Sequence, residues 1–257
     1  MRIIDTHTHL HAKQFDSDRK AVLERCAEQA VVRLIEVGYD LESSRKAIAL
    51  AEEYAHIYAV VGLQPNQIPA APDNWLAQVR SLAAHPKVVA IGEIGLDYYW
   101  NHAPHEQQEA IFREQLALAR ELALPVVIHS RDAQADTLRI LRDAAIGQPG
   151  VMHSFIGGWE FAQGCLDVGF MLSFSGPVTF PKTVDIQHVA RHAPLDMILT
   201  ETDSPYLSPE PFRGKRNEPA RVRLVAQQLA NLRNISLEAL SEHVWANAAR
   251  VFTRMQG

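Results

Sequence analysis

The feature that most constrains the fold of this chain is a regular alternation of short apolar segments with longer helical ones. Eight segments are continuous and rich in Val, Ile and Leu, which is typical of strands that are buried on both faces. They begin about every 20 to 37 residues along the chain. The predicted strands span residues 2–6, 31–37, 57–62, 88–91, 125–128, 150–152, 170–174 and 197–199.

Helical patterns fill the segments between these strands. In the clearest of them, Ile111, Phe112 and Leu116 recur at helical spacing, with most of the charges on the opposite face. Two more helices follow the last strand after a proline-rich loop at 204–219, and Ser236 is a suitable N-cap for the second. The predicted helices span residues 16–29, 41–53, 74–84, 105–122, 132–142, 159–168, 185–192, 220–233 and 237–254.

The number and length of these units predict the fold class. Eight strand–helix units of about 32 residues match the usual size of a closed (β/α)8 barrel, the TIM-barrel fold. An open, doubly wound parallel sheet is the alternative, but eight near-equal units without a glycine-rich fingerprint disfavour it. No linker, repeat or low-complexity tract divides the sequence. We therefore expect one α/β domain over residues 1–257.

Composition excludes several classes of protein. The chain is 47% hydrophobic and 21% charged, which excludes intrinsic disorder. No apolar run approaches the ~20 residues of a membrane span, and the N-terminus does not resemble a signal peptide. The two cysteines, Cys26 and Cys165, cannot form a disulfide framework and are expected to be small core residues, so a cytoplasmic location is expected. The net charge of −5 excludes a broad basic face for nucleic acid.

Histidines and carboxylates follow the predicted strands at their carboxyl ends. Active sites of (β/α)8 barrels lie on the face that these ends share, so side chains distant in sequence are expected to meet there. Read separately, each residue has an ordinary role available, such as a helix cap or a salt bridge. Six such residues on one side of the barrel favour a common site instead. They are His7, His9, Glu93, His129, His153 and Asp203.

A mixed set of imidazoles and carboxylates is typical of a site for Zn²⁺, Mn²⁺ or a similar ion. His7 and His9 are two residues apart, so on a strand both side chains point to the same face. A single catalytic ion usually takes three protein ligands, and six are more than it needs. We expect two divalent ions, Mg²⁺, Mn²⁺ or Zn²⁺, about 3.5–4 Å apart and bridged by a carboxylate.

At these motifs the chain resembles the TatD family of metal-dependent deoxyribonucleases, which are amidohydrolase-like (β/α)8 barrels. The segments that carry the resemblance are IIDTHTHL, IGEIGLDYY, LPVVIHSRDA, MHSF, ILTETDSPYL and RGKRNEPARV, in the family's order along nearly the whole chain. The resemblance implies that His7, His9 and Asp203 hold one ion. It also implies that Glu93 bridges to a second ion held by His129 and His153.

Other residues match the family's motifs without a ligand role, and one segment departs from its pattern. Arg131 and Asp132 belong to the HSRDA motif, and Asn217 and Glu218 to the RNEP motif. Where the family commonly has GxHPH after the third strand, this chain has GLQPN, with Gln64 and Asn66 in place of histidines. These amides are candidate substrate contacts that cannot become cations. The alternative is a solvated turn around Pro65.

The resemblance implies hydrolysis of phosphodiester bonds, of the 3′–5′ exonuclease type, at the end of single-stranded DNA. Asp203 is the candidate general base and Glu93 the bridging catalytic carboxylate. Arg131 either binds a phosphate oxygen or, as we favour, forms a salt bridge with Asp132 or Glu201. Glu201 itself is expected to orient a ligand imidazole.

Tyr98, Tyr99 and Trp100 follow Glu93 closely and are candidates for the mouth of the pocket, Tyr98 as a substrate contact, with packing beneath a loop as the alternative. His11, His102 and His105 also lie on this side of the barrel, and the sequence leaves their role open.

Two other functions use the same residues. One is hydrolysis of a carboxylic ester or amide, such as the ester of an aminoacyl-tRNA, because a metal-activated water can also attack a carbonyl carbon. The other is metal binding without turnover, which the complete set of six candidate ligands disfavours. The sequence indicates no stable protein partner and no membrane. Two divalent ions would add about four positive charges where a phosphate must lie, so local attraction need not follow the negative net charge.

Overall fold

The strands form one parallel sheet that closes on itself. The computed structural model describes residues 1–145 and 147–255, and within these ranges eight strands pair in the order β1 to β8. β1 also meets the end of β8, where the His9 amide donates to the Ser204 carbonyl (2.8 Å) and the Asp203 amide to the His7 carbonyl (2.9 Å). The strands are β1 Ile3–Thr8, β2 Val31–Val37, β3 Ile57–Val61, β4 Val88–Asp97, β5 Val126–Arg131, β6 Gly150–Met152, β7 Phe170–Phe174 and β8 Ile198–Thr200. This is the predicted (β/α)8 barrel.

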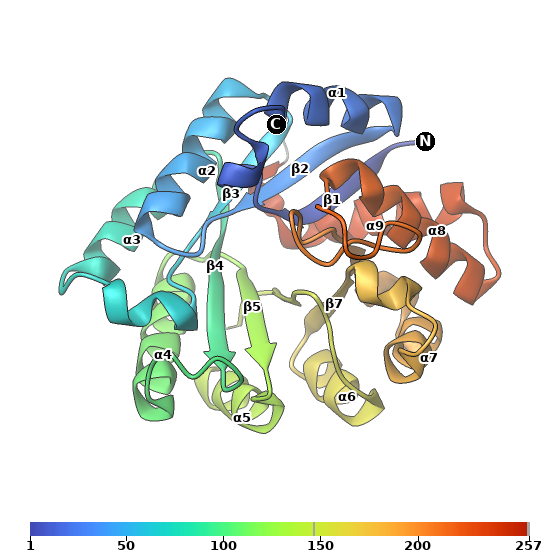
Figure 1. The fold of residues 1–257 in the computed structure, drawn as a ribbon. Helices are drawn as coiled ribbons and strands as arrows, with labels where there is room; N and C mark the ends of the chain where they lie inside the picture. The colour runs from blue at the N-terminus through green and yellow to red at the C-terminus, as the bar shows by residue number, and fades with distance from the viewer. Residues whose placement is uncertain (146, 256–257) are drawn as a thin grey trace.

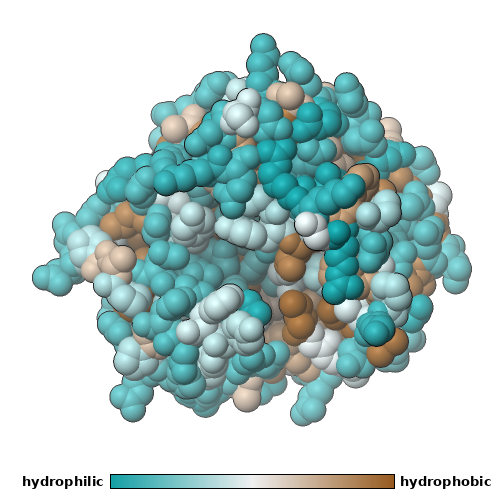
Figure 2. Space-filling view, in the orientation of Figure 1, coloured by the Kyte–Doolittle hydropathy of each residue, from teal (hydrophilic) through white to brown (hydrophobic). Residues whose placement is uncertain are grey.

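The α-helices lie around the outside of the strands (Figure 1). The polar face of each helix meets solvent while its apolar side packs on the barrel, and the face drawn in Figure 2 is mainly hydrophilic as a result. In the described residues none of the helices is long and apolar enough to cross a membrane. The helices are α1 Arg19–Glu28, α2 Leu41–Glu53, α3 Trp75–Ala83, α4 His105–Glu121, α5 Gln134–Ala144, α6 Trp159–Asp167, α7 Val184–His192, α8 Val222–Arg233 and α9 Leu237–Val251.

Local sequence explains where individual helices begin. The Asp40 carboxylate accepts the Ser43 amide at 2.7 Å, which satisfies a free N–H group in the first turn of α2. Ser236 caps α9 as predicted, with its hydroxyl oxygen accepting the Ala239 amide at 3.1 Å. Cys26 and Cys165 are both fully buried, and burial raises the pKa of each thiol to about 12. They are core residues, as expected.

Two strands are longer than the sequence pattern predicts. β4 continues to Asp97 rather than ending at residue 91, and β5 continues to Arg131. The apolar runs end earlier, but the polar residues beyond them remain in the sheet, with Gly95 paired to His129 and Asp97 to Arg131. Glu93 and His129 therefore lie within strands rather than after them. Two helices begin later than predicted, α1 at Arg19 rather than residue 16 and α5 at Gln134 rather than residue 132.

Candidate metal centre

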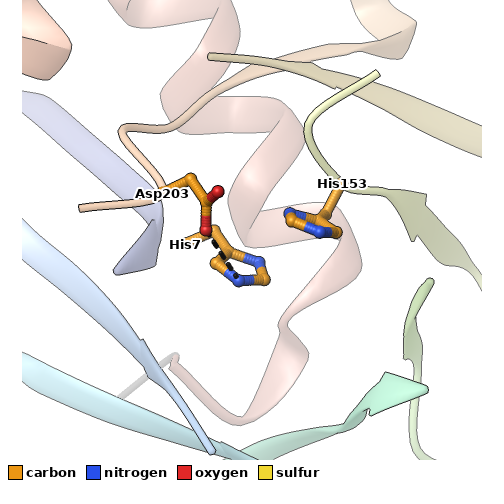
Figure 3. A group of neighbouring side chains, drawn as sticks. All are labelled: His7, His153 and Asp203. Atoms are coloured by element: carbon orange, nitrogen blue, oxygen red, sulfur yellow. Dashed lines mark ion pairs between the residues drawn. The ribbon is translucent and has the colours of Figure 1, made fainter. Parts of the chain in front are cut away.

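The first strand directs two imidazoles toward the barrel axis. His7 and His9 lie on the same side of the chain at the end of β1, as the two-residue period of a strand requires. Their Nε2 atoms are 3.3 Å apart, and both rings are buried. Asp203 reaches the same point from the loop after β8, with Oδ1 3.3 Å from His9 Nε2 and 3.7 Å from His7 Nε2. Figure 3 shows the Asp203 carboxylate directed at the His7 ring, with His153 nearby.

Glu93 lies between this group and a second one. Its Oε2 atom is 3.5 Å from His7 Nε2 and 4.0 Å from His9 Nε2. Its Oε1 atom is 2.9 Å from His129 Nδ1 and 3.3 Å from His153 Nε2. The His7 and His153 rings are stacked, with centroids 4.0 Å apart. The six candidate ligands are therefore together, and one carboxylate faces both halves of the cluster.

The backbone at Asp203 is specialised for this position. Its φ of 55° lies in the left-handed region, which aspartate tolerates better than most residues with a side chain. The carboxylate of the buried Asp5 accepts the Thr202 amide (2.9 Å) and faces the Thr202 hydroxyl at 2.5 Å. The loop after β8 is thereby tied to β1, and Asp203 is held opposite His7 and His9.

Burial and mutual contacts shift the pKa values of the cluster in opposite directions. Burial opposes charge on Glu93, yet the charge of His153 and hydrogen bonds from His129, His153 and His7 hold its pKa well below the usual range. Burial also opposes charge on His9, but contact with Asp203 raises its pKa to about 9. His7 differs, because burial and the neighbouring His153 charge lower its pKa. The cluster thus favours ionised carboxylates beside cationic charge.

The donor atoms fit a divalent cation. Bonds of about 2.1 Å in a tetrahedral arrangement place neighbouring ligand atoms about 3.4 Å apart. The contacts among His7, His9 and Asp203 span 3.3 to 3.7 Å, close to that separation. Two imidazole nitrogens facing each other at 3.3 Å need a shared cation or proton, since two lone pairs repel. The chemistry and spacing of the donors therefore match a metal centre.

Three of the four imidazoles also contact a polar group through the ring nitrogen that faces away from the cluster. His9 Nδ1 donates to the Val37 carbonyl (2.7 Å), and His153 Nδ1 lies 3.2 Å from the Glu201 carboxylate. Glu201 thus contacts the imidazole of His153, a candidate ligand, as its predicted orienting role requires. His129 Nε2 lies 2.9 Å from the Asp97 carboxylate, a partner that the sequence analysis missed. Asp97 was detectable in principle, because it is four residues after Glu93 and so shares its face of a continued strand.

Gln64 and Asn66, the two amides in place of the family's histidines, lie beside the polar groups that contact the imidazoles. Asn66 Nδ2 donates to Asp97 Oδ2 at 3.0 Å, and Gln64 Oε1 accepts the Asn66 amide at 3.2 Å. Both side chains are half-buried, and Pro65–Ala70 forms a short 3-10 helix rather than the solvated turn offered as the alternative. Asn66 therefore contacts the carboxylate that orients His129.

Arg131 and Tyr98 lie at the rim. The guanidinium of Arg131 is exposed and stacks 3.9 Å from the centroid of the Tyr99 ring. Within the described residues we find no ion pair between Arg131 and Asp132 or Glu201, so the favoured salt-bridge interpretation was wrong. The Tyr98 hydroxyl lies 3.2 Å from Asp136 Oδ2, and burial and that carboxylate raise its pKa.

Of the histidines left open, one is buried and two are exposed. His11 is buried, with its Nδ1 2.5 Å from Glu36 Oε1, and this fully buried carboxylate also accepts the amides of Leu10 and His11. His105 is exposed and stacks on Tyr98, with ring centroids 3.5 Å apart. His102 is exposed as well and lies beside Trp100.

A (β/α)8 barrel with imidazoles and carboxylates gathered at the carboxyl ends of its strands is typical of metal-dependent hydrolases. A family model described as TatD related DNase matches residues 4–253, which is nearly the whole chain. The chain belongs to this family.

Similar proteins agree in fold and class. The chain is 44% identical to an uncharacterized metal-dependent hydrolase, YabD, of Bacillus subtilis, over 97% of this chain and 98% of that protein. It is 36% identical to the uncharacterized metal-dependent hydrolase TatD of Mycobacterium tuberculosis, over 97% of each chain. The crystal structure of the TatD homologue YjjV from Escherichia coli superposes with a TM-score of 0.94 at 31% identity, covering 98% of both chains. An organophosphorus hydrolase variant from Deinococcus radiodurans shares the fold, with a TM-score of 0.62 at 13% identity.

Proposed function

We propose that this protein hydrolyses phosphodiester bonds at the end of single-stranded DNA with two divalent cations. The observation that carries the proposal is the position of Glu93, whose two oxygens face different pairs of imidazoles. Oε2 faces His7 and His9, and Oε1 faces His129 and His153 at 2.9 and 3.3 Å. A bridging carboxylate of this kind is typical of paired-ion sites that cleave phosphate esters.

The residues divide into two ligand groups. One cation would be held by His7, His9 and Asp203. The other would be held by His129 and His153, and Glu93 would contribute to both sites. When bound, divalent cations lower the pKa of water, neutralise charge on phosphoryl oxygens and orient the groups for in-line displacement.

The chain's own side chains supply the remaining functions. Asp203 keeps a low pKa despite burial, because His9 hydrogen-bonds it and His153 and His7 add positive charge. Its side chain is 14% exposed, so its carboxylate can take a proton from water at the open side of the cluster. Glu201 and Asp97 fix the orientation of His153 and His129, which keeps the nitrogens that face Glu93 aligned. Arg131 offers a planar cation to a phosphate oxygen at the rim.

The test is a substrate panel with the purified protein in Mg²⁺, Mn²⁺ or Zn²⁺. Single-stranded DNA labelled at its 5′ end, bis(4-nitrophenyl) phosphate and a D-aminoacyl-tRNA are assayed side by side. We expect stepwise shortening of the DNA from its 3′ end, release of nitrophenol and no turnover of the tRNA ester. Cleavage of the tRNA ester alone would overturn the proposal and indicate carboxylic ester hydrolysis. Metal binding with no turnover of any substrate would also overturn it.

A further inference from the structure

Two large aromatic side chains are exposed where β4 leaves the barrel. Tyr99 and Trp100 are each 54% exposed, and their rings meet edge to face with centroids 5.0 Å apart. The His102 ring is parallel to Trp100 within 10°, with centroids 6.2 Å apart. Exposed aromatic rings that gather on one surface are typical of sites that bind a ligand or a partner.

A cation lies on the same surface. The guanidinium of Arg131 is 3.9 Å from the centroid of Tyr99 and 5.6 Å from that of Trp100. Arg131 ends β5, two residues after His129, so the two residues lie about 7 Å apart on the same side of that strand. We call Tyr99, Trp100, His102 and Arg131 the rim platform. It combines ring faces with positive charge in a chain whose net charge is −5.

One carboxylate joins the rim platform to the metal centre. Asp97 Oδ1 accepts the amides of Tyr99 (3.1 Å) and Trp100 (3.0 Å), and Asp97 Oδ2 contacts His129 Nε2 at 2.9 Å. Asp97 is itself buried, and Asn66 Nδ2 donates to the same Oδ2 atom at 3.0 Å. The turn that carries the rings is therefore held in a fixed relation to a candidate metal ligand.

We infer that the rim platform binds the base and phosphate next to the bond that is cleaved, and so selects single-stranded nucleic acid over small phosphate esters. The inference rests on the proposed function. Proteins that bind single strands without sequence preference use aromatic faces for the bases and cations for the backbone, and the platform offers both. Stacking is sequence-tolerant because every base has a flat π-face, so no base-edge contact is required.

The test measures binding separately from catalysis. A fluorescent hexathymidylate and an abasic strand of the same length are titrated in low salt with EDTA, and fluorescence anisotropy is recorded. We expect the unaltered protein to prefer the strand with bases and Trp100→Ala to bind it about 5- to 100-fold more weakly. Trp100→Phe keeps a stacking ring and should recover most of the affinity, whereas binding of the abasic strand should change little.

Trp245→Ala is the matched control. Trp245 also lies under arginines, with the Arg2 and Arg33 guanidinium groups 4.4 and 4.7 Å from its ring, but at the opposite end of the barrel. Equal affinities of the Trp100→Ala and Trp245→Ala proteins, or no preference for bases in the unaltered protein, would overturn the inference. Turnover of bis(4-nitrophenyl) phosphate separates the two hypotheses. If turnover is absent from the unaltered protein the proposed function fails. If turnover is present there and in the Trp245→Ala control, undiminished binding of the hexathymidylate by Trp100→Ala overturns the platform alone.

Discussion

Polar side chains have different kinds of partner at the two ends of the barrel. At the amino ends of the strands, polar side chains are satisfied by the backbone or by rings. Asn247 Nδ2 donates to the carbonyls of Leu195 (3.0 Å) and Ile198 (2.9 Å), and Arg254 donates to those of Ala83 and Val88. At the carboxyl ends, imidazoles and carboxylates converge on one another instead. Satisfied groups hold the fold together, whereas the converging ones favour a ligand.

Because of this difference, we expect residues at the amino ends of the strands to affect mainly stability and those at the carboxyl ends mainly activity. Two buried imidazole nitrogens in close contact destabilise a fold unless a shared cation or proton joins their lone pairs, as for His7 and His9 with Nε2 atoms 3.3 Å apart. A buried donor that reaches two carbonyls stabilises the fold and has no free capacity for a substrate. Substitutions at the two ends should therefore give different results in the same pair of measurements, activity and thermal unfolding.

The largest effect is expected for Glu93→Gln. The substitution keeps the shape of the side chain but removes the charge that faces all four imidazoles. Loss of several kcal/mol of cation binding and transition-state stabilisation should lower kcat by at least about 10³-fold. Metal content per protein, measured by emission spectroscopy, should fall, while the circular dichroism spectrum is unchanged. Glu242→Gln is the control, since Glu242 forms an exposed ion pair with Arg2 at the other end. Unchanged metal content in Glu93→Gln would contradict the bridging role.

Asn247→Ala should lower stability and leave turnover unchanged, which is the reverse of the result expected for Glu93→Gln. The change removes the side-chain donor from the buried Ile198 carbonyl, at about 1–3 kcal/mol, and from the half-buried Leu195 carbonyl, at about 1 kcal/mol, so we expect a loss of about 2–4 kcal/mol. In a chain of this size that lowers Tm by roughly 4–16 °C. Calorimetry measures this shift, and turnover at 20 °C should remain that of the unaltered protein. A large loss of turnover without a loss of stability would show that the two ends are not separable in this way.

Addition of metal should raise the stability of the protein only through the cluster at the carboxyl ends of the strands. At about 100 times its Kd, a divalent cation that binds only the folded state adds about 2.7 kcal/mol to stability. We expect Mn²⁺ to raise Tm in the unaltered protein and in Asn247→Ala by the same increment. In Glu93→Gln the increment should shrink, because the carboxylate shared by both ligand groups is gone. Equal increments in all three proteins would place metal binding somewhere other than this cluster.

The sequence predicts the architecture and brings out the candidate ligands, but it does not reveal the residues that contact those ligands. Continuous apolar runs locate strands because only buried strands need them, and His7 and His9 follow from the strand period. The ends of β4 and β5 were missed because polar residues there are paired by the sheet and not by hydrophobicity. Asp97 was missed for this reason, and with it the contact of Asn66, which depends on a 3-10 helix bringing residue 66 to residue 97. Such contacts between chain segments leave no local pattern.

The smallest effect is expected for the contact between Asn66 and Asp97. It tests how many of the residues around the candidate ligands affect metal affinity. Asn66→Ala removes one hydrogen bond from an uncharged amide to the Asp97 carboxylate, which still accepts from His129, Tyr99 and Trp100. A loss of about 0.5–1.5 kcal/mol corresponds to a 2- to 10-fold weaker metal affinity, measured by chelator competition. Asn66→Asp should be worse, because it places a second carboxylate where Asp97 now receives a donor. Gln67→Ala, the next position in the same 3-10 helix, is the control. If Asn66→Ala and Asn66→Asp both bind metal as the Gln67→Ala protein does, the functional end stops at Asp97, and the amide at position 66 serves only the local fold.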